Sequence, residues 1–119
     1  MKINLKRAYI EASDKDGYRV LIDRLWPRGL SKVKLHVDEW AKDLAPSQDL
    51  RLWFAHKPER FEAFQKKYLE ELKGNEAVEE FVKNHKKIQV ITLIYAAKEL
   101  PLSHAPLLQK FLLKKFLNK

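Results

Sequence analysis

The sequence predicts an α/β fold: a small sheet of three or more strands, at least partly parallel, covered by helices in a single domain over residues 1–119. Two runs rich in β-branched and apolar residues, 18–26 and 88–95, are typical of buried strands. Between them, apolar residues recur at spacings of three and four, which is typical of helices that cover a sheet. No internal repeat or low-complexity segment divides the chain, so we expect one hydrophobic core.

The first two strands are expected close to the N-terminus. Residues 3–10 form the first, and the turn-rich SDKDG at 13–17 follows it. Residues 18–26 carry apolar side chains on both faces, which predicts a central, buried strand. The connection of about seven residues is too short for a parallel crossover, so these two strands are antiparallel if they pair directly.

Helices are expected in the middle of the chain. Ser31 can cap a short helix whose apolar stripe extends to Leu44. Ser47 can cap another that carries Leu50, Trp53 and Phe54.

The second half alternates between helix and strand. Pro58 suits the first turn of a longer helix, which Gly74 ends. A further helix is expected over residues 75–84, a strand over 88–95, and a last helix from about Ser103.

The chain is strongly basic. Its 24 Lys and Arg residues against 16 Asp and Glu give a net charge of +8, which suggests phosphorylated or polyanionic partners. Many of the lysines fall on expected helix faces or near helix C-termini, where they complement the helix dipole. A solvated helical surface therefore explains the same charge, and both interpretations stay open.

Composition excludes several classes of protein. The chain has no cysteine, which excludes disulfides, thiolate zinc sites and a cysteine nucleophile, and fits a cytoplasmic location. No apolar run approaches the ~20 residues that span a bilayer, and the N-terminus lacks the apolar core of a secretory signal, so no membrane association is expected. Glycine-rich phosphate loops and the GxSxG and HExxH motifs are absent, and no cofactor is expected.

The candidate site lies where two strands end. The strand at 18–26 delivers Asp23, Arg24 and Arg28, and the later strand ends in Tyr95 and is followed by Lys98. Ligands of open α/β sheets bind beyond the carboxyl ends of the strands. If these two strands are neighbours, the three cations converge, and the planar fork of arginine can hold a phosphate or carboxylate at two points. The sequence therefore predicts an anion-binding pocket.

Each of these residues has a structural alternative. Arg24 can pair with Asp23 or with a nearby helix acid, and so close a corner of the fold. Trp26 can belong to the core instead of walling a pocket, and Lys98 can be an ordinary surface lysine.

The four histidines, at 36, 56, 85 and 104, do not have the spacing of helical metal ligands, so no metal site is expected. His56 lies between two helices and is a candidate general acid or base, with a polar turn residue as the alternative. Asp23 is the second candidate catalytic residue, and the acids at 38, 39 and 43 stay open as carboxylate bases. His104, at the start of the last helix, is expected to stay neutral and to donate a hydrogen bond to a ligand.

Four stretches together resemble a known family: GYRVLIDRLWPRGLSK at 17–32, WAKDLAPS at 40–47, LRLWFAHKPERFEAFQKKY at 50–68 and LIYAAK at 93–98. The chain resembles the family of domain of unknown function 488, in its YeaO-like branch of small bacterial proteins, over about residues 3–115. The resemblance implies a compact α/β domain in a bacterial cytoplasmic protein and no established activity.

The recurring motif positions of that family match Asp23, Arg24, Trp26, Arg28, Lys42, Asp43, Trp53, His56, Tyr95 and Lys98. The resemblance thus adds Lys42 to the anion-binding candidates. Two departures stand out. Relatives usually carry a His-Asn pair before the last helix, where this chain has ELPLSHAP, and Ala55 and Lys57 replace the usual glycine and aspartate.

We therefore expect a small phosphate- or carboxylate-bearing molecule, a class that includes nucleotide-like molecules, to bind at the strand ends. The residues assigned to the site are Arg24, Arg28, Lys98 and Lys42 for the anion, Trp26, Trp53, Tyr95 and His104 for the wall, and His56 and Asp23 for acid/base chemistry. Enzymatic turnover, the identity of the ligand and the oligomeric state stay open.

Two other classes of function compete with this one. The alternative is a nucleic-acid-binding or regulatory protein that uses the +8 surface. A third interpretation is an interaction module, for which Leu113 and Leu117 of the last helix would supply an exposed apolar patch.

Overall fold

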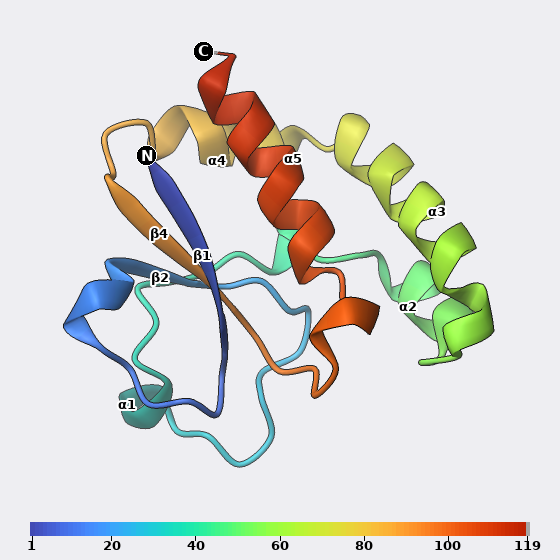
Figure 1. Ribbon diagram of the computed structural model, residues 1–119, viewed down its shortest axis with the longest axis horizontal. Coiled ribbons are helices and arrows are strands. Elements are labelled where there is room, and N and C mark those ends of the chain that lie inside the picture. Colours follow the sequence, from blue (N-terminus) through green and yellow to red (C-terminus); the bar gives the residue numbers. More distant parts are fainter. Residues whose placement is uncertain (119) are drawn as a thin grey trace.

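The computed structural model describes residues 1–118 as a parallel four-stranded sheet with helices packed against it (Figure 1). The strands are β1 (Lys2–Arg7), β2 (Tyr18–Leu21), β3 (Glu39–Trp40) and β4 (Val90–Tyr95), in the spatial order β1-β4-β2-β3. The helices are α1 (Lys32–Leu35), α2 (Gln48–Phe54), α3 (Phe61–Lys73), α4 (Glu76–Asn84) and α5 (Ala105–Leu117). The predicted α/β class, with a partly parallel sheet, is confirmed.

β4 is the central strand of the sheet. It pairs in parallel with β1 on one side and with β2 on the other, where Leu21 lies opposite Ile94. The two strands that precede the candidate site are therefore neighbours, as the pocket hypothesis requires. β1 and β2 do not pair with each other, so the antiparallel arrangement considered for a direct pair does not arise.

Both faces of the sheet are buried. Side chains alternate between the two faces along each strand. Leu93 of β4 faces the main core, which α2, α3, α4 and α5 cover, whereas Ile94 faces a smaller cluster with Leu35 of α1. The main core contains the apolar stripes expected of the helices, through Phe64, Tyr68, Leu72, Val78, Phe81, Val82, Leu108 and Leu112. α5 lies against β1 (Figure 1). The Gln109 side chain of α5 donates a hydrogen bond of 2.7 Å to the Ile3 carbonyl.

The second face of the sheet holds a buried charged network. Arg19 is 2% exposed, and its side chain donates from Nη1 to Asp16 Oδ2 at 2.6 Å, from Nη2 to the Leu35 carbonyl at 2.8 Å and from Nε to the His36 carbonyl at 3.0 Å. Lys6 Nζ lies 3.0 Å from the same carboxylate. Arg19 thereby ties β2 to the end of α1, which covers this face.

One predicted helix is wrong. The chain after Ser31 does not continue as a helix to Leu44, although Ser31 Oγ does cap α1 by accepting from the Lys34 N–H at 3.1 Å. α1 ends at His36, whose φ of 49° is left-handed, and the chain then extends to form β3 opposite β2. Leu44 instead lies in a 3₁₀ turn, η2 (Lys42–Leu44).

Other boundaries differ by a few residues. The first strand ends at Arg7 instead of residue 10, and β2 ends at Leu21 instead of Trp26. α5 begins at Ala105 instead of Ser103. The Ser47 cap is confirmed, since Ser47 Oγ accepts from the Leu50 N–H at 3.1 Å.

Candidate functional site

A carboxylate and an imidazole meet just beyond β2 and β4. Asp23 Oδ2 accepts a hydrogen bond from the Ala96 N–H at 2.9 Å, so the segments that follow the two strands are joined here. Asp23 Oδ1 lies 3.5 Å from His104 Nε2, which is 2.9 Å from the Ile22 carbonyl oxygen. Because that carbonyl can only accept, Nε2 of His104 carries the proton. Two residues assigned to the site from sequence thus lie together.

Burial sets the protonation of this pair. Burial raises the pKa of Asp23 above its ordinary value, although His104, the Ala96 N–H and Arg51 each oppose the rise. Burial also lowers the pKa of His104, and the Asp23 carboxylate and the Ile22 carbonyl only partly offset that effect. The lowered pKa of His104 is consistent with the neutral imidazole expected from the sequence, and burial is the main cause of both shifts.

Arg24 closes a corner of the fold. Its Nε donates to the Pro46 carbonyl at 3.1 Å and its Nη2 approaches the Ala45 carbonyl at 3.5 Å. These two carbonyls lie just before the start of α2, so Arg24 joins the end of β2 to that helix. Arg24 makes no ion pair with Asp23 in the described part of the chain, and its corner-closing partners are carbonyls instead of an acid.

Beside this corner, α3 contributes two polar side chains that the sequence analysis did not assign to the site. The Tyr68 hydroxyl donates to the Leu44 carbonyl at 2.6 Å, and burial raises its pKa well above the ordinary value, so the phenol stays protonated. Glu71 accepts from the Ser47 N–H at 2.9 Å and from the Ser47 hydroxyl at 2.5 Å. A buried tyrosine in an apolar stripe needs a partner for its hydroxyl, which is the signal that could have found this contact.

Arg51 of α2 is the other residue that sequence reasoning missed. Its Nε is the one buried side-chain nitrogen or oxygen without a hydrogen-bond partner in residues 1–118. Arg51 also lies close enough to Asp23 to lower the pKa of that carboxyl. The sequence signal that could have indicated Arg51 is its position on α2 between Leu50 and Phe54, the buried residues of that helix.

Trp26 packs as a core residue. It lies against the smaller cluster of Leu21 and Ile94, and its indole N–H donates to the Leu30 carbonyl at 2.6 Å. Its ring contacts that of Trp40 edge-on, with 5.4 Å between centroids. Lys42 is exposed and holds its ammonium group 4.5 Å from the centroid of the Trp40 ring.

Trp53 of α2 and His56, which follows that helix, are both exposed. The cations of Arg60 and Lys67 lie 5.3 Å and 5.2 Å from the centroid of the Trp53 ring. His56 is exposed and has a φ of 55°, directly after Ala55 with a φ of 47°. Two consecutive non-glycine residues in the left-handed region store backbone strain of about 1–2 kcal/mol each.

The remaining site candidates differ in exposure. Tyr95 is 6% exposed and belongs to the main core. Arg28 and Lys98 are both exposed, and the backbone carbonyl of Arg28 accepts from the Tyr9 hydroxyl at 2.9 Å.

Two surface hollows lie away from the Asp23–His104 pair. One, of about 230 Å³, runs between β3 and α4 and is lined in part by Trp40, Lys42 and His85. The other, of about 350 Å³, lies among α3, α4 and α5. Across residues 1–118 there is no group of three or more histidine and acidic side chains that could hold a metal ion, and none of the helices there is long and apolar enough to cross a membrane.

The chain belongs to the family described as the inactive DUF488-N3 subclade, whose model matches residues 2–119. The predicted membership of the domain of unknown function 488 family is confirmed.

Among individual proteins, the chain is similar to "Uncharacterized protein YeaO" of Escherichia coli (strain K12), with 41% identity over 112 residues that cover 94% of this chain and 97% of the relative. It is also similar to "Uncharacterized protein Rv3073c" of Mycobacterium tuberculosis (strain ATCC 25618 / H37Rv), with 40% identity over 111 residues that cover 93% of each chain. No solved structure gives a significant match.

Proposed function

We propose that this protein binds a small organic anion, bearing a phosphate or carboxylate group, at the carboxyl ends of β2 and β4. The adjacency of these parallel strands supports the proposal, because ligands of open α/β sheets bind at such strand ends. The Asp23–Ala96 hydrogen bond fixes the two following segments beside each other.

The observation that carries the proposal is the buried Nε of Arg51 without a partner. More than nine in ten buried polar groups are hydrogen-bonded, and an orphaned guanidinium nitrogen near a strand end points to an absent acceptor. An anion that enters beside Asp23 supplies that acceptor after a rotation of the Arg51 side chain, a change that is common when ligands bind.

The other cations take different parts. Arg24 already donates to two carbonyls, so it positions the wall of the site beside α2. Arg28 and Lys98 are exposed and add long-range attraction for an anion. Lys42, Trp53 and His56 lie in other surface clusters, and we leave them out of the core of the site.

Binding without turnover is the form of the function that we favour. The description of the family as an inactive subclade supports it. The Asp23–His104 pair is the acid/base group nearest to the proposed anion. The other candidate, His56, is exposed, and the centroid of its ring lies 6.1 Å from that of Phe54.

A thermal-shift screen of inorganic phosphate, nucleotides, sugar phosphates, dicarboxylates and short oligonucleotides tests the proposal. The wild type is compared with Arg51→Gln, at low and high salt. A ligand at about a hundred times its dissociation constant stabilises the fold by ~2.7 kcal/mol, which a thermal shift detects. The control for the loss of one positive charge is Lys32→Gln on α1, the helix that covers the face of the sheet away from α2 and Arg51.

We expect one class of small anion to raise the melting temperature of the wild type and of Lys32→Gln in a salt-tolerant manner, and to lose that effect in Arg51→Gln. Shifts from oligonucleotides alone, erased by salt and equal in all three proteins, would favour the nucleic-acid alternative. Stabilisation by none of the small anions would refute the proposal.

A further inference from the structure

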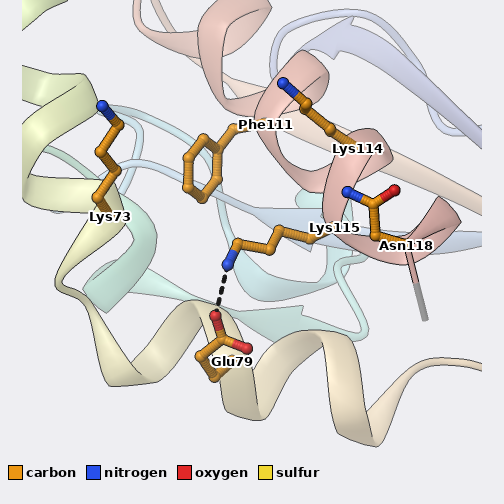
Figure 2. A pocket seen from close by; sticks show the side chains of 6 residues that line it. All are labelled: Lys73, Glu79, Phe111, Lys114, Lys115 and Asn118. Carbon is orange, nitrogen blue, oxygen red and sulfur yellow. Dashed lines mark hydrogen bonds and ion pairs between the residues drawn. The ribbon is translucent and has the colours of Figure 1, made fainter.

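A second hollow lies far from the strand-end site, where the ends of three helices meet. It has a volume of about 350 Å³ and is lined by Lys73 of α3, Glu79 of α4, and Phe111, Lys114, Lys115 and Asn118 from α5 and its C-cap. Figure 2 shows these side chains around one space, with the Phe111 ring between Lys73 and the α5 lysines. The volume falls in the range of sites that hold small organic ligands.

The charge in this hollow is positive. Three ammonium groups line it against the Glu79 carboxylate, whose Oε1 lies 2.8 Å from Lys115 Nζ (Figure 2). The C-terminal ends of α3 and α5 each contribute about −0.5 charge through their free carbonyls, and the N-terminal end of α4 contributes about +0.5. Lys73 Nζ also lies 3.5 Å from Glu70 Oε1, in an exposed ion pair outside the hollow that holds the lysine only weakly. With Glu70 counted, about half a positive charge remains, so the acids and helix dipoles do not use up the lysines.

Phe111 supplies an apolar wall to the same hollow. Its ring is partly buried against the main core, and Lys115 Nζ lies 5.8 Å from the ring centroid. A planar or apolar group that packs on this ring gains from burial, while an acidic group attached to it reaches the ammonium groups. Inorganic phosphate can bind only the ammonium groups of the hollow, and a neutral aromatic molecule can pack only on the Phe111 ring.

We propose that the hollow among α3, α4 and α5 is a binding site for an organic anion, a phosphomonoester or a carboxylate attached to an aromatic or apolar group. Lys73 and Lys114 contact the acidic group, Lys115 stays paired with Glu79, and Phe111 packs against the ring of the ligand. This site is independent of the one at the carboxyl ends of β2 and β4.

Titration of the ¹⁵N-labelled protein, followed by two-dimensional amide spectra, tests the proposal with defined probes. Phenyl phosphate and benzoate test the two acidic groups, and inorganic phosphate and phenol each carry one half of the expected ligand. We expect the aromatic anions to move the amide signals of Lys73 and of the last turn of α5, and to bind at least about tenfold more tightly than phosphate or phenol. The Ala96 amide reports on the strand-end site in the same spectra, so the two sites are distinguished.

Two variants examine the assigned contacts. Lys73→Gln/Lys114→Gln is expected to weaken aromatic-anion binding about tenfold, and Phe111→Leu to remove the advantage of phenyl phosphate over inorganic phosphate. Lys83→Gln/Lys86→Gln removes the same charge from exposed positions at the end of α4 and is the matched control. The spectra themselves report whether each variant is folded. Unmoved α5 amides at millimolar probe, or equal weakening in the control, would overturn the proposal.

Discussion

Replacement of Arg19 by methionine should destabilise the protein strongly, because Arg19 is a buried cation with several acceptors. The change removes charge-assisted hydrogen bonds to the Leu35 and His36 carbonyls and to Asp16. Removing one partner of a buried ion pair costs about 3–5 kcal/mol. Asp16 keeps Lys6 as a second cation, at 3.0 Å, so we expect a loss of about 3 kcal/mol, toward the lower end of that range.

The free energy of unfolding from urea titrations, followed by circular dichroism, measures this loss. Lys66→Met is the matched control, because its ion pair with Glu62 spans 3.8 Å between side chains that are 80% and 87% exposed, and it should leave stability unchanged. A loss below about 1 kcal/mol for Arg19→Met would show that the network on this face does not stabilise the fold as argued.

The same network predicts a response to acid. Burial raises the pKa of Asp16, but the Ser13 N–H, Lys6 and Arg19 outweigh burial and hold that pKa below its usual 3.8. A carboxyl with a lowered pKa in the folded state stabilises the fold above the unfolded pKa and loses that contribution as the pH falls through the lowered value. The pH dependence of stability below about pH 4 should therefore be shallower in Asp16→Asn.

Two further predictions concern backbone and proton binding. Gly17→Ala should be far more destabilising than Gly29→Ala. Both glycines have a positive φ, of 64° and 82°, but only at residue 17 would the added Cβ collide with the Val90 backbone carbonyl. Equal melting temperatures of the two variants would contradict this prediction. Because burial lowers the pKa of His104 below 6.5, the unfolded chain binds the proton first, so stability should fall as the pH drops below about 6.5. His104→Gln should lack that fall in thermal melts between pH 7 and pH 5, and an unchanged profile would rule out His104 as its source.

The order of helices and the strand at β4 followed from the sequence because their signals extend over many residues. Phe64, Tyr68 and Leu72 repeat at helical spacing along α3, and the run that ends at Tyr95 is apolar on both faces. β3 could not be predicted in this way. Its two residues, Glu39 and Trp40, have no period, and their pairing with β2 depends on the turn at His36.

The sequence could predict where the candidate site would lie, but not which side chains would contact one another there. The strand-end rule placed Asp23 beside the segment that follows β4, and Asp23 does accept a hydrogen bond from the Ala96 N–H there, because β2 and β4 are neighbours. The Asp23–His104 contact joins segments about eighty residues apart, and no local pattern encodes such a pair. Arg51 was not predicted as a site residue because an arginine on a short helix is ordinarily solvated. Only the burial of its Nε atom, which the structure shows, distinguishes it.

The central place of β4 affects how the chain folds. β1 pairs only with β4, and β2 is joined to β1 only through β4, so Lys2 must find Val90, and Tyr18 must find Ile91, before these strand edges are paired. Contacts of such long sequence separation carry a loop-closure cost that slows folding. During synthesis the first two strands leave the ribosome well before β4, so the edges that β4 later pairs are open, and in that interval the chain is most prone to aggregation.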